Sequence, residues 1–491
     1  MKQRAPLTLA AAAAALGAFV GLAHLTVPAA PAAADGKAAA ARMPVERSAL
    51  VCPAPSSSDI AETTYTAITP GAAGGGKGSA RLLGATKEAK PVLELKERGR
   101  PAGATASGAE APGLAGIADG ILAPGWTAQQ TTKVSVGRAR GLLGVACTAP
   151  GTDFWFPGAS TAKGREDYVH LTNPDDTAAV IDIKMFGPDG TVKDETGVSE
   201  NIRIDPRSTK AISLASLAPG KELADVTAHV ATRAGRVGAS LQAAEEGVGA
   251  DWLAASADPA AAQVLPGIPA DATSVKLVAF APGEEDADLT VRLAGPNGSI
   301  SPAGNEHLHV KAGMTASVDL KDVTRGEAGS LLLAPADPKK AVPVVAALRV
   351  VRGSGAKQEL AFVPAAGPVG ARATVADNRA DENATVLSLT ATGADARVKV
   401  TASPGTEAGE PAAEEVTVKA GTTQAVSLAP GGAKGAYALT VETLSGGPVH
   451  AARTLTLPHE GIVMFTVQTL SDDRGTVPVP KAVQDLTVLT R

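Results

Sequence analysis

Three segments of this chain repeat one pattern of apolar and polar residues at a spacing close to one domain. The segments are 202–214, 308–320 and 416–428, and their apolar positions coincide when they are aligned. The spacings of 106 and 108 residues exceed the roughly 20–50 residues of a solenoid repeat, so each copy has the length of a whole domain. The chain is therefore predicted to be a row of similar modules, an arrangement that usually serves to bind, space or scaffold other molecules.

The local pattern inside the modules predicts β-strands. Stretch 179–186 is strand-like and runs into Gly-Pro-Asp-Gly at 187–190, where proline and glycine suit a tight turn. Gly-Pro-Asn-Gly at 295–298 is the counterpart in the next module. Alternation with frequent turns is typical of antiparallel sandwiches. We expect an all-β fold of tandem immunoglobulin-like antiparallel β-sandwich modules, where the term describes architecture alone because the repeats lack a Cys-Trp-Cys spacing.

The boundaries between modules are predicted from proline-rich stretches and from the spacing of the repeated segments. The first unit matches the others least and is interpreted as a diverged fourth copy. The predicted organisation is a Pro/Ala linker at 35–44, a diverged β module at 45–160, and β-sandwich repeats at 161–268, 269–370 and 371–491.

The amino terminus has the three parts of an export signal. Lys2 and Arg4 precede an apolar stretch at 7–27, and three alanines at 32–34 fit the small-residue rule for cleavage. The apolar stretch is also long enough to span a bilayer uncleaved. Residues 1–34 are therefore expected to be a signal peptide or a membrane anchor. Either reading gives an extracytoplasmic protein, secreted or tethered, whose membrane contact is confined to residues 7–27.

The chain has two cysteines, Cys52 and Cys147, each at the end of an apolar strand-like run. In an exported protein a lone pair is expected to form a disulfide. Two free thiols and a metal site are the alternatives, although two cysteines without a nearby histidine cannot complete a zinc shell.

The charge and composition of the chain bear on whether it binds nucleic acid and on what its cores are made of. The formal net charge is −5 and no basic block is visible, so nucleic-acid binding has no electrostatic support. Aromatic residues make up 3% of the chain, so the cores must be built from Val, Leu, Ile and Ala.

Candidate catalytic and metal motifs are weak. The glycine-rich stretch 71–79 resembles a phosphate-binding loop but has Gly78 where Ser or Thr must follow Lys77. His307 and His309 share one face of a predicted strand, but that face is expected to point to solvent. The acidic run 284–288 lacks the ligand spacing of a calcium loop. We therefore predict no catalytic residues, no metal site and no cofactor.

Three consecutive aromatic residues are the best candidate for a ligand site. Phe154 and Phe156 should point to one face of a strand, and Trp155 to the other. Trp155 could then stack on a sugar ring or a peptide. The alternative interpretation is that these rings seal the junction between the first two units, because aromatic side chains bury large areas.

The mature chain resembles a family of actinobacterial exported proteins classed only as a domain of unknown function. The resemblance rests on the Ala-rich signal, Val-Cys-Pro at 51–53, the segments 144–147 and 150–155, and the turn at 187–190. It implies an envelope or secreted protein without an assigned role.

The leading functional hypothesis is a non-enzymatic extracytoplasmic protein of the cell envelope that acts as a scaffold or binding module. Its expected partner is an unknown envelope protein or a cell-surface glycan. One alternative is a carbohydrate-binding protein centred on Trp155. The other is an exported hydrolase, which requires a cleft with converging Asp, His or Ser.

Overall fold

The computed structural model describes residues 41–72, 75–88, 90–195 and 197–479. The predicted export signal, 1–34, and linker residues 35–40 lie outside this range. The chain divides into two compact units, residues 44–476 and a second unit made of 1–43 and 477–491. At the two ends of the described chain, β1 (Ala41–Pro44) pairs with β36 (Thr476–Val479). Within the described residues, no helix is long and apolar enough to cross a membrane.

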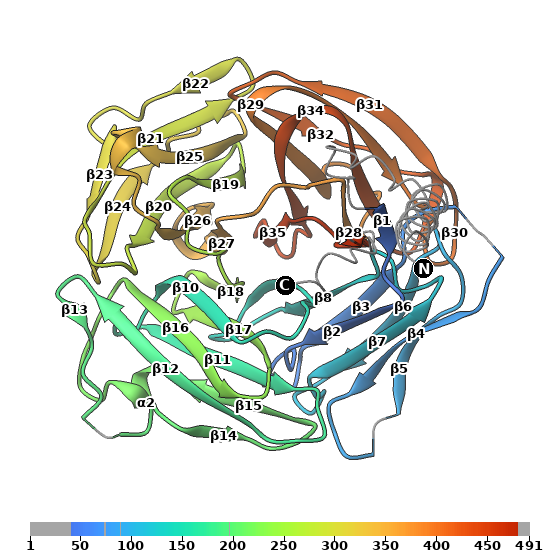
Figure 1. The fold of residues 1–491 in the computed structure, drawn as a ribbon, viewed down its shortest axis with the longest axis horizontal. Coiled ribbons are helices and arrows are strands. Elements are labelled where there is room, and N and C mark those ends of the chain that lie inside the picture. Colours follow the sequence, from blue (N-terminus) through green and yellow to red (C-terminus); the bar gives the residue numbers. More distant parts are fainter. Residues whose placement is uncertain (1–40, 73–74, 89, 196, 480–491) are drawn as a thin grey trace, which may run out of the picture. The chain divides into compact units, whose positions relative to one another are not determined.

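The unit formed by 44–476 is built almost entirely from antiparallel sheets, as predicted (Figure 1). The first sandwich has sheets β2–β7–β4–β5 and β6–β3–β8–β9. Its strands are β2 (Arg47–Cys52), β3 (Glu62–Ile68), β4 (Gly78–Gly84), β5 (Pro91–Leu95), β6 (Ala102–Ser107), β7 (Leu114–Gly120), β8 (Thr127–Val134) and β9 (Gly141–Ala146).

The second sandwich repeats this strand order with sheets β10–β16–β12–β13 and β15–β11–β17–β18, and β14 pairs with β12. A short helix, α2 (Leu214–Leu217), follows β15. The strands are β10 (Asp153–Ala159), β11 (Arg165–Asn173), β12 (Ala179–Gly187), β13 (Gly190–Thr191), β14 (Ile202–Ile204), β15 (Ser208–Ser213), β16 (Val226–Ala234), β17 (Gly238–Glu245) and β18 (Gly249–Leu253).

The third sandwich has sheets β19–β25–β21–β22 and β24–β20–β26–β27, and β23 pairs with β21. Two short 3-10 helices, Pro338–Lys340 and Gly355–Lys357, lie in its loops. The strands are β19 (Gln263–Ile268), β20 (Ala272–Phe280), β21 (Ala287–Gly295), β22 (Gly298–Ile300), β23 (His307–Val310), β24 (Thr315–Lys321), β25 (Gly329–Pro335), β26 (Val345–Arg352) and β27 (Glu359–Pro364).

In the fourth module two long strands each take the place of two strands in the other modules. β29 (Thr385–Ala402) pairs with β32 (Thr422–Val426) through its first half and with β31 (Ala412–Val418) through its second half. β34 (Tyr437–Thr456) likewise pairs with β28 (Arg372–Asn378) and then with β35 (Phe465–Leu470). Both halves bury their apolar residues in one core. A small ribbon of β30 (Ala408–Glu410) and β33 (Gly431–Lys434) accompanies them.

The strand pairing shifts two of the predicted module boundaries. β10 pairs with β16 and so opens the second sandwich, whereas the predicted first module runs to residue 160. β19 pairs with β25 and opens the third sandwich, whereas the predicted second module runs to 268. The reason is that a strand joins the sheet in which its backbone groups find partners, and these partners lie far along the chain.

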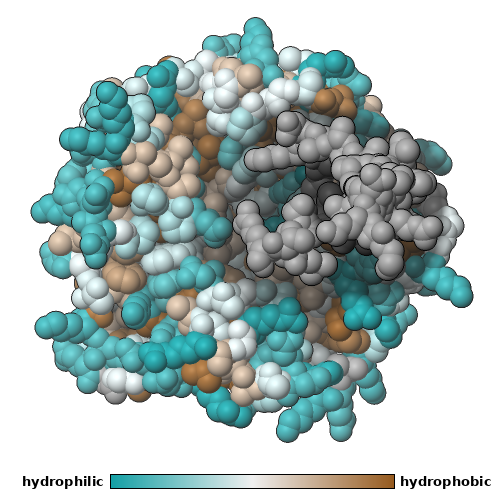
Figure 2. Space-filling view, in the orientation of Figure 1, coloured by the Kyte–Doolittle hydropathy of each residue, from teal (hydrophilic) through white to brown (hydrophobic). Residues whose placement is uncertain are grey.

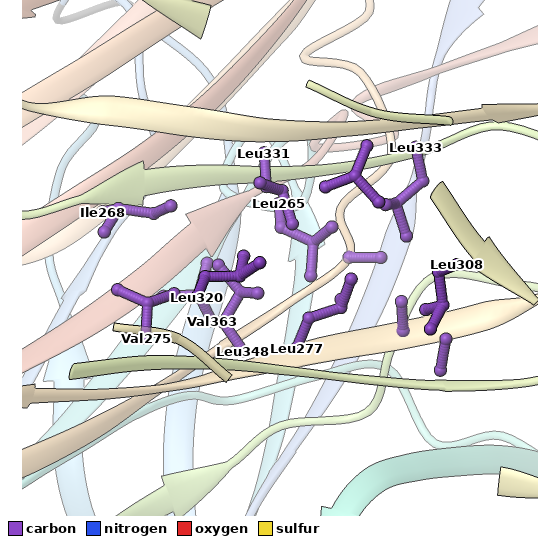
Figure 3. Close-up of a cluster of buried hydrophobic side chains, with 14 of the residues drawn as sticks. Leu265, Ile268, Val275, Leu277, Leu308, Leu320, Leu331, Leu333, Leu348 and Val363 are labelled. Carbon is purple, nitrogen blue, oxygen red and sulfur yellow. The ribbon is translucent and has the colours of Figure 1, made fainter. Parts of the chain in front are cut away.

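The cores consist of aliphatic side chains that alternate along the strands. In the third sandwich, Figure 3 shows Leu265 and Leu331 from one sheet together with Leu277 and Leu348 from the other, and all four are fully buried. Alternate residues of a strand point to opposite faces, so one face of each sheet lies in the core. Such packing is tight, and loss of one buried leucine costs roughly 2–5 kcal/mol.

The predicted disulfide is present. Cys52 at the end of β2 is bonded to Cys147 just after β9, and their Cα atoms are 4.4 Å apart. Both cysteines are buried in the core of the first sandwich. The bond therefore joins the two sheets of this module and closes a loop with a sequence separation of 95 residues.

The last strands of the four modules contact each other in a closed cycle. β9 contacts β18, β18 contacts β27, β27 contacts β35, and β35 contacts β9. Asp251 on β18 links three of them, because it accepts hydrogen bonds from the Gly144 amide at 3.0 Å and from the Thr466 hydroxyl at 3.0 Å. Arg140 donates to the carbonyls of Val248 and Gln358. The four modules thus pack on one another through this junction rather than forming a string of separate beads.

Candidate functional site

The predicted aromatic site lies on β10, and Trp155 is half-buried there. Phe154 and Phe156 are buried in the core of the second sandwich, as the alternation predicts. Trp155 points to the opposite face of the sheet, where His229 stacks on it at 3.6 Å between ring centroids with an interplanar angle of 8°. Phe280 of the third sandwich stacks on it at 5.4 Å. Trp155 therefore has a ring against it from each of two modules.

These aromatic side chains form the joint between the second and third sandwiches. Phe186 completes the cluster, 4.5 Å from Phe280 and 6.2 Å from Trp155. Asp153 binds the His229 ring at 3.0 Å, and burial lowers the pKa of His229. The interpretation that the rings seal a junction between the first two units placed them one module too early, because β10 belongs to the second sandwich. Trp155 keeps part of its surface exposed, although two rings already lie against it.

The predicted solvent-facing histidine pair is exposed on β23. His309 lies 2.7 Å from Asp288 and 3.6 Å from Asp286, two members of the acidic run. Among the residues that the structure describes, no group of three His, Cys, Asp or Glu side chains could hold a metal ion.

A groove of about 630 Å³ lies between the first and fourth modules and is the candidate ligand site. Its floor is the outer face of the sheet formed by β28, β34 and β29, and its wall is the loop that joins β5 to β6. On Figure 2, hydrophilic and apolar side chains alternate in small groups over the described part of the face in view. The charged and hydroxyl residues that line the groove are Glu97, Arg98, Arg100, Arg372, Lys399, Thr401, Ser403, Thr440 and Glu442.

The floor carries its polar side chains in two rows across the strands. Arg372, Glu442 and Lys399 are register partners on adjacent strands and form a row of alternating charge. Thr440 and Thr401 are register partners in the neighbouring row. Their chain neighbours, such as Val441 and Val400, point into the module core, so strand alternation places these polar groups on the groove side.

Arg372 also connects the fourth module to the first. Its guanidinium donates to a carboxylate oxygen of Asp473 at 2.5 Å and to the Pro124 carbonyl at 3.3 Å. Much of its charge is therefore compensated within the protein. Lys399 and Glu442 take part in no ion pair of 4.0 Å or less among the described residues.

The wall presents two arginines. Arg98 donates to the Pro70 carbonyl at 3.1 Å, and its Nε is buried without a hydrogen-bond partner. Gly71 has a φ of +117°, and a Cβ there would lie 2.6 Å from the Arg98 guanidinium, so the backbone passes close to this arginine. Arg100 is exposed and donates one hydrogen bond, to the Glu407 carbonyl. Both side chains keep donor groups available for a ligand.

The side chains that line this groove can bind a polar ligand. The lining side chains offer guanidinium, ammonium, carboxylate and hydroxyl groups, and none of the lining residues is His, Cys or Asp. Thr440 and Glu442 lie two residues apart on the groove side of β34, and Lys399 and Thr401 do so on β29. The groove can therefore hold a polar ligand by hydrogen bonds and charge.

A second groove, of about 540 Å³, lies between the first and second sandwiches and brings His170 near Ser56, Ser57 and Ser208. Burial lowers the pKa of His170 to about 4, and its ring packs edge-on against Trp252 at 4.9 Å. A histidine with such a pKa is a poor general base near neutral pH. This groove therefore gives little support to the hydrolase alternative.

Most of this chain matches the model of a protein family. The model of a family of unknown function, DUF5719, matches residues 102–429. The chain belongs to this family. No curated protein matches the chain.

Only some of the residues that line the groove lie within the part of the chain that the family model matches. Arg372, Lys399 and Thr401 lie within residues 102–429, whereas Arg98, Arg100, Thr440 and Glu442 lie outside. The aromatic joint around Trp155 lies wholly within the matched region. The joint between the second and third sandwiches is thus inside the matched part of the chain, and the groove is only partly inside it.

Sequence reasoning did not find this groove. One local signal was present, because residues 96–100 read Lys-Glu-Arg-Gly-Arg and are the wall of the site. The floor residues give no such signal, since they alternate with core residues as on any half-exposed strand. They meet the wall only because the fourth module packs against the first.

Proposed function

We propose that this protein is a non-enzymatic, extracytoplasmic binding protein or scaffold of the cell envelope. The observation that carries the proposal is the groove between the first and fourth modules, which offers guanidinium, ammonium, carboxylate and hydroxyl groups to a ligand. Export is supported by the signal-like amino terminus and by the buried disulfide, because disulfides persist mainly in oxidising compartments.

The packing of the four modules supports a rigid binding body rather than a flexible spacer. Interfaces between modules contain buried hydrogen bonds such as Ser330 to Thr390 at 2.7 Å and Thr66 to Asp377 at 3.0 Å. They also contain buried apolar side chains, among them the Phe465 ring within the core cluster of the third sandwich. A rigid body keeps the floor and wall of a groove in place, which lowers the entropic cost of binding.

The test is fractionation of the native bacterium, with mass spectrometry of the protein's amino terminus and of the molecules that co-purify with it. We expect the protein in the membrane or wall fraction or in the medium, together with an envelope protein or glycan. A protein found in the cytoplasm with its first 34 residues intact would refute the extracytoplasmic part of the proposal. Hydrolysis of envelope material by the purified chain would refute the non-enzymatic part.

A further inference from the structure

The groove between the first and fourth modules contains two kinds of binding group that rarely serve the same ligand. Arg98 and Arg100 on the wall and Lys399 on the floor donate hydrogen bonds and carry positive charge. Glu442 lies beside Lys399 on the adjacent strand, and Glu97 lies beside Arg98 in the loop. A ligand that carries acidic groups together with many hydroxyl donors can satisfy both kinds.

We propose that this groove binds an acidic polysaccharide, a chain of hydroxyl-rich sugars that bears carboxylate or phosphate groups. The inference rests on the proposed binding function and names the ligand class of the same site. The arginines hold the acidic groups, since a guanidinium matches carboxylate and phosphate oxygens with two parallel hydrogen bonds. The glutamates accept hydrogen bonds from sugar hydroxyls, and Thr401 and Thr440 can donate or accept.

Part of the half-buried Arg98 guanidinium is open to an anion in the groove. Its Nε is buried and has no hydrogen-bond partner, although its Nη2 is held by the Pro70 carbonyl. A buried donor without a partner costs about 1–3 kcal/mol. The Nε itself is shielded from the groove, so an acidic ligand would bind the guanidinium through its remaining N–H groups.

The geometry disfavours the other large ligands. Extended peptides commonly bind by adding a strand to a sheet edge, whereas the floor here is the face of a sheet in which β34 and β29 have neighbours on both sides. Single-stranded nucleic acids need aromatic side chains for base stacking, and none of the groove-lining residues is aromatic.

Binding assays on the purified full-length chain test this inference. The probes are oligomannuronate, which bears carboxylates, a phosphorylated mannan oligosaccharide, neutral mannotetraose, and polyglutamate as a peptide anion. We expect one or both acidic saccharides to bind at least about ten-fold more tightly than mannotetraose and polyglutamate, and this binding to weaken as NaCl rises, because salt screens exposed charges.

The variants are Arg100→Ala and Lys399→Ala, whose side chains are exposed and make few internal contacts, so folding should survive. Each is expected to weaken binding roughly ten-fold, the effect of losing one charge-assisted hydrogen bond. Arg292→Ala is the matched control, because Arg292 is an exposed strand arginine of the third sandwich that bonds only Ser299. Its affinity should equal that of the wild type.

The outcomes separate the two proposals. Equal binding of acidic and neutral saccharides, tighter binding of polyglutamate, or unchanged affinity in both variants would overturn the inference. If the protein is recovered with envelope material while every acidic saccharide fails to bind, the ligand class is wrong and the binding function stands. If no envelope material is recovered with the protein either, the proposed function fails as well.

Discussion

Glu359→Gln should make the protein more stable at alkaline pH and leave it unchanged in acid. Glu359 is the first residue of β27 and is 1% exposed. Its Oε2 is buried without a hydrogen-bond partner, and burial raises its pKa from 4.5 to about 8, against the weaker opposing effect of Arg140. The folded protein therefore keeps this carboxyl protonated over a range in which the unfolded chain has ionised it.

The sign and the magnitude follow from this difference. A pKa that is higher in the folded state stabilises the protein fully below pH 4.5, and the stabilisation is lost as the pH rises towards 8. At about 1.36 kcal/mol per pH unit, the loss is on the order of 5 kcal/mol. Glutamine has the shape of the protonated acid and cannot ionise, so the variant avoids this loss.

Thermal unfolding of both proteins from pH 4 to 9 measures the effect. The two melting temperatures should agree at pH 4, and the variant should melt roughly 5 °C higher at pH 9, since a unit of this size unfolds with an entropy near 1 kcal/mol per degree. Burial also raises the pKa of the neighbouring Asp251, so the pH dependence of the wild-type melting temperature reflects both carboxyl groups. The difference between the wild type and the variant isolates the contribution of Glu359.

Glu284→Gln is the matched control, because Glu284 is exposed in the acidic run. Its melting temperature should follow that of the wild type at every pH. If the Glu359→Gln curve also runs parallel to the wild type from pH 4 to 9, Glu359 is not buried as a neutral acid at the junction of the four modules, and the reasoning is refuted.

Three further changes test the packing. Trp155→Ala should lower the free energy of unfolding by roughly 3 kcal/mol, seen in denaturant unfolding, because it opens the joint between the second and third sandwiches; an unchanged midpoint would show that the joint is not packed. Cys147→Ser should lower the free energy of unfolding by about 4–5 kcal/mol under the chain-entropy model, and a reducing agent should not destabilise this variant further. A wild-type protein whose stability does not change with reducing agent would contradict the bond to Cys52. Gly144→Ala should lower the melting temperature, because the new Cβ would lie 2.5 Å from a Thr466 methyl carbon and push β9 away from β35; an Ala variant as stable as the wild type would mean that these strands do not touch.

Local sequence was sufficient for the strands and for their inward faces. Leu308 and Val310 are buried while His307 and His309 are exposed, because strand alternation is a property of neighbouring residues. The turn at 187–190 closes a hairpin in which Gly187 pairs with Gly190. The two cysteines could be paired because the chain has no others.

Tertiary structure alone decided which module a strand joins and what the modules build together. β10 follows the first module closely in sequence, yet its partner β16 lies some seventy residues further on. The sequence of β10 alone does not show which strand it pairs with. The sequence allows Trp155 to be a ligand platform or part of a joint between modules, and only the position of Phe280 in the next module shows that Trp155 lies at a joint. The groove likewise joins residues 97–100 to 399–404 and 440–442. The alternation of apolar and polar residues along a strand shows which of its faces is buried in the module core. It does not show which distant module packs against the other face, because that depends on residues far away in the sequence.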